Sequence, residues 1–102
     1  MSTVKAAFIF VAPQNDYNIH QAVIDSPVVS LTVVGVRNYD EAELVTQLLI
    51  DEGITAIELC AGFGSEGVTR VSRIAAGKAV VGVVRFELHP AFGHRSGDEI
   101  FG

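Results

Sequence analysis

The sequence predicts an α/β domain built on a small parallel sheet. Four strongly apolar runs are separated by segments with a helical spacing of apolar residues, and the connections between them are short. Apolar strands that alternate with amphipathic helices are typical of parallel sheets covered on both faces. We therefore expect a four-stranded parallel sheet in the flavodoxin-like order 2-1-3-4, with helices on both faces.

The first half of the chain contains two of these strands. Residues 6–12 form a continuous apolar run that ends at a proline, and residues 28–36 form a second run. Between them, Asn15 or Asp16 is placed to cap a short helix over residues 17–25.

The second half repeats the alternation within one domain, which we expect to span residues 1–102. Asp40 and Glu43 have the spacing of a capping box, and Gly53 suits the left-handed position after a helix. A strand that begins at Ile54 and ends in a glycine turn follows. The remaining expected elements are a helix over 65–76, a strand over 79–86 and an irregular tail from about residue 87.

Composition excludes several classes of protein. The chain has 102 residues and a net charge of −5, and its seven basic residues are not clustered, so we expect no nucleic-acid or membrane partner. No apolar run reaches the roughly 18–20 residues that span a bilayer. A single cysteine excludes an internal disulfide and zinc sites built from several cysteines. We expect a cytoplasmic protein that needs no cofactor and no metal.

Two charged residues lie inside apolar runs. Glu58 is flanked by Ile57 and Leu59, and Arg85 lies near the end of the next run. Because a lone buried charge is costly, we expect the two to approach each other. Such a pair is either a structural ion pair or a ligand-facing pair, with Arg85 holding an anion and Glu58 acting as acid or base.

Cys60 follows Glu58 by two residues and precedes a glycine-rich turn. At this position it is either a packed small hydrophobe or a nucleophile activated by the start of the next helix. The turn contains Gly62, Gly64 and Ser65, whose backbone N–H groups are candidates for binding an anion. The alternative is a tight turn without a ligand.

Other candidate residues lie in loops on the same edge. Asn15 follows the first strand, and Glu87, His89 and His94 follow the last one. His89 is a candidate general base; a metal site and an ordinary polar loop are the alternatives. Loops at the carboxyl ends of parallel strands share one edge of the sheet, so these groups are expected to lie together.

Four segments resemble a family of small, mainly bacterial α/β proteins of unknown function. They are Lys5–Pro13, Ile57–Gly64, Val81–Phe86 and His89–Pro90. The resemblance covers nearly the whole chain and implies an independent single domain. It implies no activity and no catalytic residue.

Two functions remain open. The first is a cofactor-free enzyme, a lyase, isomerase or hydrolase, that acts on a small carboxylate or phosphate metabolite through Cys60, Glu58, His89 and Arg85. The second is a non-catalytic module that binds a small ligand or forms an oligomer. Open sheet edges and a tail with two phenylalanines favour a homo-oligomer, most simply a dimer.

Overall fold

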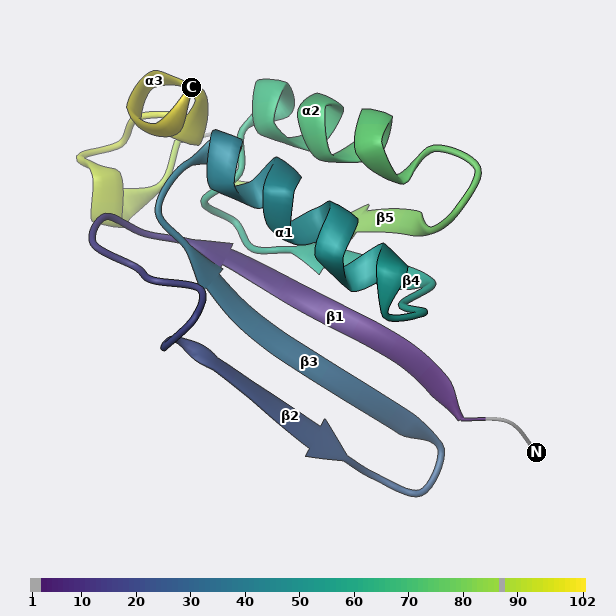
Figure 1. The fold of residues 1–102 in the computed structure, drawn as a ribbon. Coiled ribbons are helices and arrows are strands. Elements are labelled where there is room, and N and C mark those ends of the chain that lie inside the picture. Colours follow the sequence, from purple (N-terminus) through teal and green to yellow (C-terminus); the bar gives the residue numbers. More distant parts are fainter. Residues whose placement is uncertain (1–2, 87) are drawn as a thin grey trace.

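The computed structural model describes residues 3–86 and 88–102, and within them it confirms the α/β class. A single five-stranded sheet in the order β2-β3-β1-β4-β5 packs against helices on one face (Figure 1). The sheet is mixed, so the prediction of a four-stranded, wholly parallel sheet is wrong.

The parallel part of the sheet coincides with the four apolar runs. Strand β1 (Val4–Val11) lies at the centre and pairs in parallel with β3 (Val29–Val36) and with β4 (Ala56–Leu59). Strand β5 (Val80–Val83) continues the sheet beyond β4, also in parallel. The carboxyl ends of these strands therefore lie along one edge, as the sequence predicted.

The predicted helix over residues 17–25 is wrong. A turn is followed there by strand β2 (Gln21–Asp25), which runs antiparallel to β3. The Oγ of Ser26 donates to the carbonyl oxygen of Val29 at 2.8 Å and closes the hairpin between the strands. A helix this short is marginal on its own, whereas the β-branched side chains of this segment suit a strand and its backbone gains hydrogen bonds to β3.

The two long helices, α1 (Tyr39–Asp51) and α2 (Ser65–Ala75), lie on the same face of the sheet (Figure 1). The prediction of helices on both faces is therefore wrong. Each helix lies within a crossover connection: α1 connects β3 to β4, passing β1, and α2 connects β4 to β5. Both connections run in the same direction along the sheet. Right-handed crossovers in one direction place their helices on one face. The helix predicted between β1 and β3 was the one expected on the other face, and that segment forms β2.

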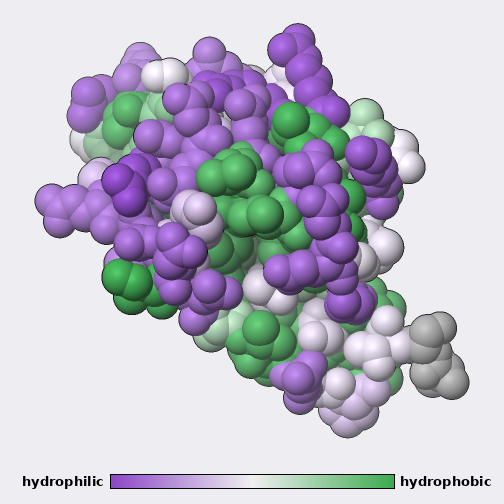
Figure 2. Space-filling model, viewed as in Figure 1, coloured by the Kyte–Doolittle hydropathy of each residue, from purple (hydrophilic) through white to green (hydrophobic). Residues whose placement is uncertain are grey.

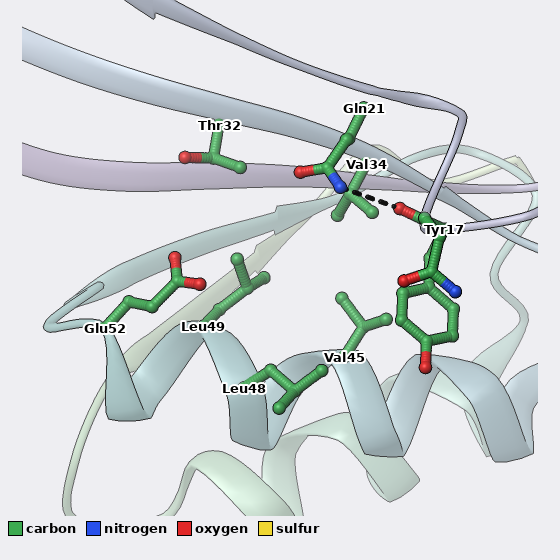
Figure 3. Close-up of a pocket in the computed structure, with 9 residues that line it drawn as sticks. Tyr17, Gln21, Thr32, Val34, Val45, Leu48, Leu49 and Glu52 are labelled. Atoms are coloured by element: carbon green, nitrogen blue, oxygen red, sulfur yellow. Dashed lines mark hydrogen bonds between the residues drawn. The ribbon is translucent and has the colours of Figure 1, made fainter.

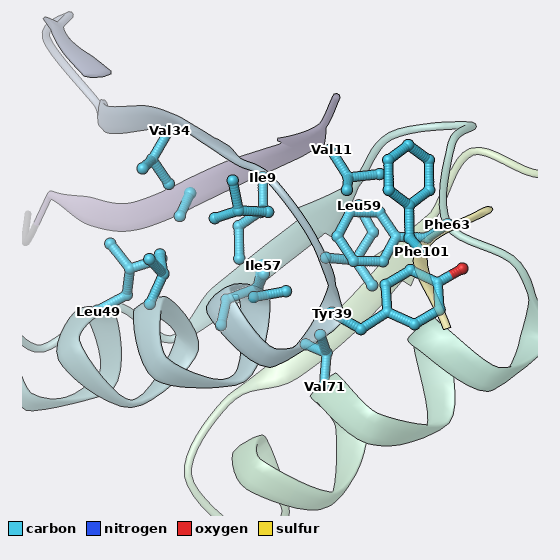
Figure 4. Packing of buried hydrophobic residues seen from close by; sticks show 14 of the residues in the cluster. Ile9, Val11, Val34, Tyr39, Leu49, Ile57, Leu59, Phe63, Val71 and Phe101 are labelled. Carbon is cyan, nitrogen blue, oxygen red and sulfur yellow. The ribbon is translucent and has the colours of Figure 1, made fainter. Parts of the chain in front are cut away.

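The core fills the space between the sheet and the helices (Figure 4). Alternate residues of β1 and β4 point at the helices, and Ile9, Ile57 and Leu59 are at most 1% exposed. Burial of each such side chain contributes about 1.5–3 kcal/mol. The cluster is completed by residues that include Val34, Val36, Tyr39, Val45, Leu49, Phe63, Val71 and Phe101.

Helix α1 begins earlier than the sequence indicated. Asn38 is its N-cap, and the Oδ1 of Asn38 accepts a hydrogen bond from the N–H of Glu41 at 2.9 Å. The capping box expected from Asp40 and Glu43 does not form, because both carboxylates pair with Arg70 of α2. The helix ends before Gly53, whose φ of +93° is the left-handed conformation expected there.

The tail, for which the sequence indicated no regular structure, contains a short 3-10 helix, η1 (Pro90–Phe92), and the helix α3 (Gly97–Phe101). Figure 1 shows α3 beside the start of α2. Phe101 is only 6% exposed and belongs to the core cluster. The tail is thus an integral part of the fold.

Candidate functional site

The carboxyl edge of the sheet gathers the glycine turn, the start of α2 and the tail. The carboxylate of Asp98, in α3, accepts hydrogen bonds from the N–H of Glu66 at 3.0 Å and from the N–H of Gly67 at 3.3 Å. Gly64, the N-cap of α2, has no side chain that could do this. Asp98 therefore caps α2 from a distant part of the sequence and places a negative charge at the positive end of its dipole.

Tyr39 connects this cap to the core. Its hydroxyl donates to Asp98 Oδ1 at 3.0 Å and accepts from the N–H of Gly64 at 2.9 Å. Its ring stacks on Phe63, with 5.6 Å between ring centroids. Burial, above all, raises the pKa of the Tyr39 hydroxyl beyond its usual value, so the group remains a donor. The glycine turn, α2 and α3 are thereby held by one hydrogen-bonded network.

In the turn that the sequence predicted to bind an anion, backbone N–H groups are hydrogen-bonded to other groups of the chain. The N–H of Gly62 donates to the Sγ of Cys60 at 3.3 Å, and the N–H of Gly64 donates to Tyr39. The N–H of Val11 also donates to the Cys60 sulfur, at 3.5 Å. The N–H groups of Gly62 and Gly64, which were candidates for binding an anion, therefore bind side chains of the protein.

Glu58 and Arg85 do not pair. Glu58 lies opposite Gly82 of β5 and is exposed on the sheet face that has no helices. Arg85 instead donates from Nη1 to the Oγ of Ser65 at 2.7 Å, at the start of α2. Glu58 lies in β4, whereas Arg85 lies beyond the end of β5 at Val83 and reaches the start of α2.

The other predicted site residues are engaged in local contacts. The ring of His89 lies between Phe86 and Phe92, at centroid distances of 4.9 and 4.6 Å, and its Nδ1 accepts from the N–H of Ala91 at 3.1 Å. Asn15 donates from Nδ2 to a carbonyl oxygen of β3. Glu87 lies outside the described residues. Among the described residues, no cluster of three or more potential metal ligands occurs.

A preformed cavity lies elsewhere, between α1 and the edge of the sheet formed by β2 and β3 (Figure 3). Its volume is about 210 Å³. Apolar side chains form its floor: Val34 from β3, and Val45, Leu48 and Leu49 from α1. The turn before β2 and β2 itself contribute Tyr17, Asn18 and Gln21 to its lining.

Polar groups line the mouth of this cavity. Figure 3 shows Glu52 and Thr32 at one end and Tyr17 and Gln21 at the other. The Nε2 of Gln21 donates to the carbonyl oxygen of Tyr17 at 3.1 Å, which fixes the amide. The carboxylate of Glu52 has no hydrogen bond or ion pair with any described residue. An apolar floor with a few converging polar groups is the usual composition of a small-molecule site.

An exposed apolar area adjoins the cavity. Apolar side chains gather over α1 in the middle of the face shown in Figure 2, within a mainly hydrophilic surface. Leu44 and Leu48 of α1 are 48% and 43% exposed, and Leu48 also lines the cavity. Leu48 therefore belongs both to this exposed area and to the lining of the cavity.

The sequence did not reveal the residues that organise the carboxyl edge of the sheet and the cavity beside α1. Tyr39 and Asp98 lie 59 positions apart, and only the folded tail brings them together. Glu52 resembled one more charge on a solvated helix face. The sequence Ser96–Gly97–Asp98 did carry a signal for a helix start, and Ser96 Oγ indeed caps α3 by accepting from the N–H of Asp98.

The fold and its contacts define a two-layer α/β domain whose tail caps its second helix. This chain belongs to the family of unknown function DUF6506, which it matches over residues 4–99. The resemblance inferred from the sequence is thereby confirmed. No curated protein and no solved structure matches the chain. No helix in the described part of the chain has the length and apolar character needed to cross a membrane.

Proposed function

We propose that the protein is a non-catalytic module that binds a small apolar molecule with a cationic head, such as an amine. The observation that carries the proposal is the cavity between α1 and the β2–β3 edge, with its apolar floor and the unpaired carboxylate of Glu52 at its mouth. A hydrocarbon body would cover Val34 and Leu49 while an ammonium group stays at the mouth beside Glu52.

Charge and size support this class of ligand. Glu52 is the one ionisable side chain among those that line the cavity at neutral pH, and the net charge of −5 attracts cations to the protein. A volume of about 210 Å³ is below the roughly 300–1,000 Å³ of sites for drug-sized molecules. A molecule with one ring and a short amine, such as benzylamine, has a suitable size.

Benzylamine titrated into the protein in a calorimeter tests the proposal. We expect Glu52→Gln to weaken binding about two- to fivefold, the effect of losing one exposed charge pair of up to about 1 kcal/mol. Asp51→Asn is the matched control, because Asp51 is the neighbouring acidic residue but does not line the cavity. It removes the same charge from the protein and should leave the affinity nearly unchanged.

One uncharged probe, benzyl alcohol, and one anionic probe, benzoate, complete this experiment. Benzyl alcohol should bind more weakly than benzylamine, and benzoate should bind most weakly. Equal affinity for the three probes, or an equal loss in both variants, would contradict recognition of the cation by Glu52. Absence of binding by all three would reject the cavity as a site for this class of molecule.

A second candidate is the cofactor-free enzyme at the carboxyl edge. One observation favours it: the Cys60 sulfur and the Phe92 ring both lie 3.3 Å from the position that a Cβ on Gly62 would take, and Phe92 also contacts the His89 ring. Thiol and imidazole therefore lie near the same aromatic ring. In this candidate Cys60 and His89 act on a small anion that displaces Asp98 from the first N–H groups of α2, and Glu58, exposed on the helix-free face, takes no part.

Alkylation of the single cysteine tests this candidate. A catalytic Cys60 should react rapidly with iodoacetamide at pH 7 in the folded protein, and His89→Ala should slow the reaction. If Cys60 is only a packed side chain, it should react slowly until denaturant is added, with or without His89. The second result would remove the enzyme from consideration.

A further inference from the structure

Strand β2 is an open edge of the sheet. It is the last strand on the β3 side, and all five of its residues are exposed. It contains no lysine, no proline and no bulge, which are the features that commonly prevent an edge strand from pairing with another chain. The edge is therefore free to accept a further strand.

The hydrogen bonds of the hairpin show which backbone groups point outward. The carbonyl oxygen of His20 accepts from the N–H of Gly35 at 2.8 Å, and the N–H of Ser26 donates to the carbonyl oxygen of Val29 at 2.9 Å. In an antiparallel ladder, every second residue turns both its groups to the partner strand. The residues that turn theirs to the open edge are therefore Gln21, Val23 and Asp25, although the N–H of Gln21 is already bonded to Ile19.

We propose that β2 pairs antiparallel with β2 of a second copy of the chain, with the two-fold axis at Val23. The outward N–H and carbonyl groups of Val23 then bond to the same groups of the partner copy. The N–H of Asp25 meets the free carbonyl oxygen of Gln21 in the other copy. The result is one continuous sheet across the two copies.

The side chains in this register are complementary. Gln21 stands opposite Asp25 of the other copy, where its amide, which has a second N–H beyond the one bonded to Tyr17, can donate to the carboxylate. Ala22 stands opposite Ile24 on the helix-free face. Because of the two-fold axis, each of these pairs occurs twice, and both of its members come from the same strand in the two copies.

The opposite edge of the sheet, strand β5, lacks such complementary side chains. Strand β5 is shorter and consists of three valines and a glycine, so it has no polar pair that could set a register. The inference extends the homo-oligomer expected from the sequence to a defined surface. It does not depend on the ligand cavity, because pairing can be measured without a ligand.

Proline substitutions with light scattering test the surface. Val23→Pro removes an N–H that points to the open edge, and edge strands tolerate proline at such positions. We expect the unmodified chain to be a dimer and the Val23→Pro chain to be a monomer with unchanged circular dichroism. Val83→Pro is the control: the N–H groups of Val80 and Val84 bond to β4, so alternation turns that of Val83 to the β5 edge. It should leave the dimer intact.

Charge exchange tests the register and does not depend on the proline variant's folding. Gln21→Glu should weaken the dimer about tenfold, because two like-charged pairs then oppose each other. Adding Asp25→Lys should restore it. The two positions lie about 13 Å apart along one strand, so restoration has to come from pairing between copies. A monomeric unmodified chain, a dimer that survives Val23→Pro, or a double variant as weak as the single one would overturn the proposal.

Discussion

Gly97→Ala is expected to lower the free energy of unfolding by about 3 kcal/mol. Gly97 is buried where α3 crosses the glycine turn, and an added Cβ would overlap the carbonyl oxygen of Gly62. The overlap is with backbone, so no side-chain rotation can relieve it. The variant can fold only if α3 moves away from the turn, and that movement exposes Phe101 and separates Asp98 from α2.

The matched control is Gly82→Ala. Gly82 lies in β5, is exposed, and has no atom within 4 Å of the position a Cβ would take. Its substitution should change the stability by no more than about 0.5 kcal/mol. Urea unfolding of both variants gives the comparison. Equal stability of the two would show that α3 does not pack against Gly62.

Asp98→Ala is expected to cost about 2–3 kcal/mol. The substitution removes the cap of α2 and leaves the Tyr39 hydroxyl without its acceptor in a buried setting. A lost cap costs about 0.5–2 kcal/mol and a lost hydrogen bond to a charged group about 1.5–3 kcal/mol, but the two overlap because one carboxylate makes both. Urea unfolding measures the total.

Hydrogen exchange shows whether the cap is the cause. The N–H groups of Glu66 and Gly67 should exchange faster in Asp98→Ala, while those in the middle of α1 stay protected. Glu99→Ala is the control, because Glu99 is the exposed acidic neighbour in α3. A loss of stability as large in Glu99→Ala as in Asp98→Ala would mean that general helix charge, and not the cap, is responsible.

The parallel strands could be predicted because their signal is local. Each is a continuous apolar run that matches a strand buried in a sheet; β3, β4 and β5 lie within the expected runs, and β1 overlaps its expected run but begins before it. The helix α2 was also predictable, since the glycine turn and its apolar stripe define both its start and its buried face. These features depend on a few neighbouring residues only.

The error over residues 17–25 had a larger consequence than its length suggests. Ile19, Ala22 and Val23 fit a helical stripe, but the segment forms β2 because β3 offers it a free edge. A helix there would have covered the second face of the sheet. One local ambiguity, decided by a tertiary contact, therefore changed a three-layer prediction into a two-layer fold.

The residues that the sequence predicted to gather at the carboxyl edge are brought together there only in part. Cys60, Gly62, Gly64 and Ser65 do lie at the carboxyl edge, as topology requires. The sequence could not show that Tyr39 of α1 accepts from Gly64 of this turn, or that Asp98 of the tail accepts from the first N–H groups of α2, because both contacts join residues that are far apart in the sequence. The same limit applies to Glu52, whose place at a cavity depends on the packing of α1 against the β2–β3 edge.

The most direct test of the central claim is a benzylamine titration followed through the backbone amide resonances of the protein. We expect shifts at Thr32, Val34, Leu48 and Glu52, around the cavity, and unchanged resonances at Gly62 and Gly64 in the glycine turn. Shifts confined to the glycine turn, or shifts at neither place, would contradict the claim that the protein binds its ligand between α1 and the edge of the sheet.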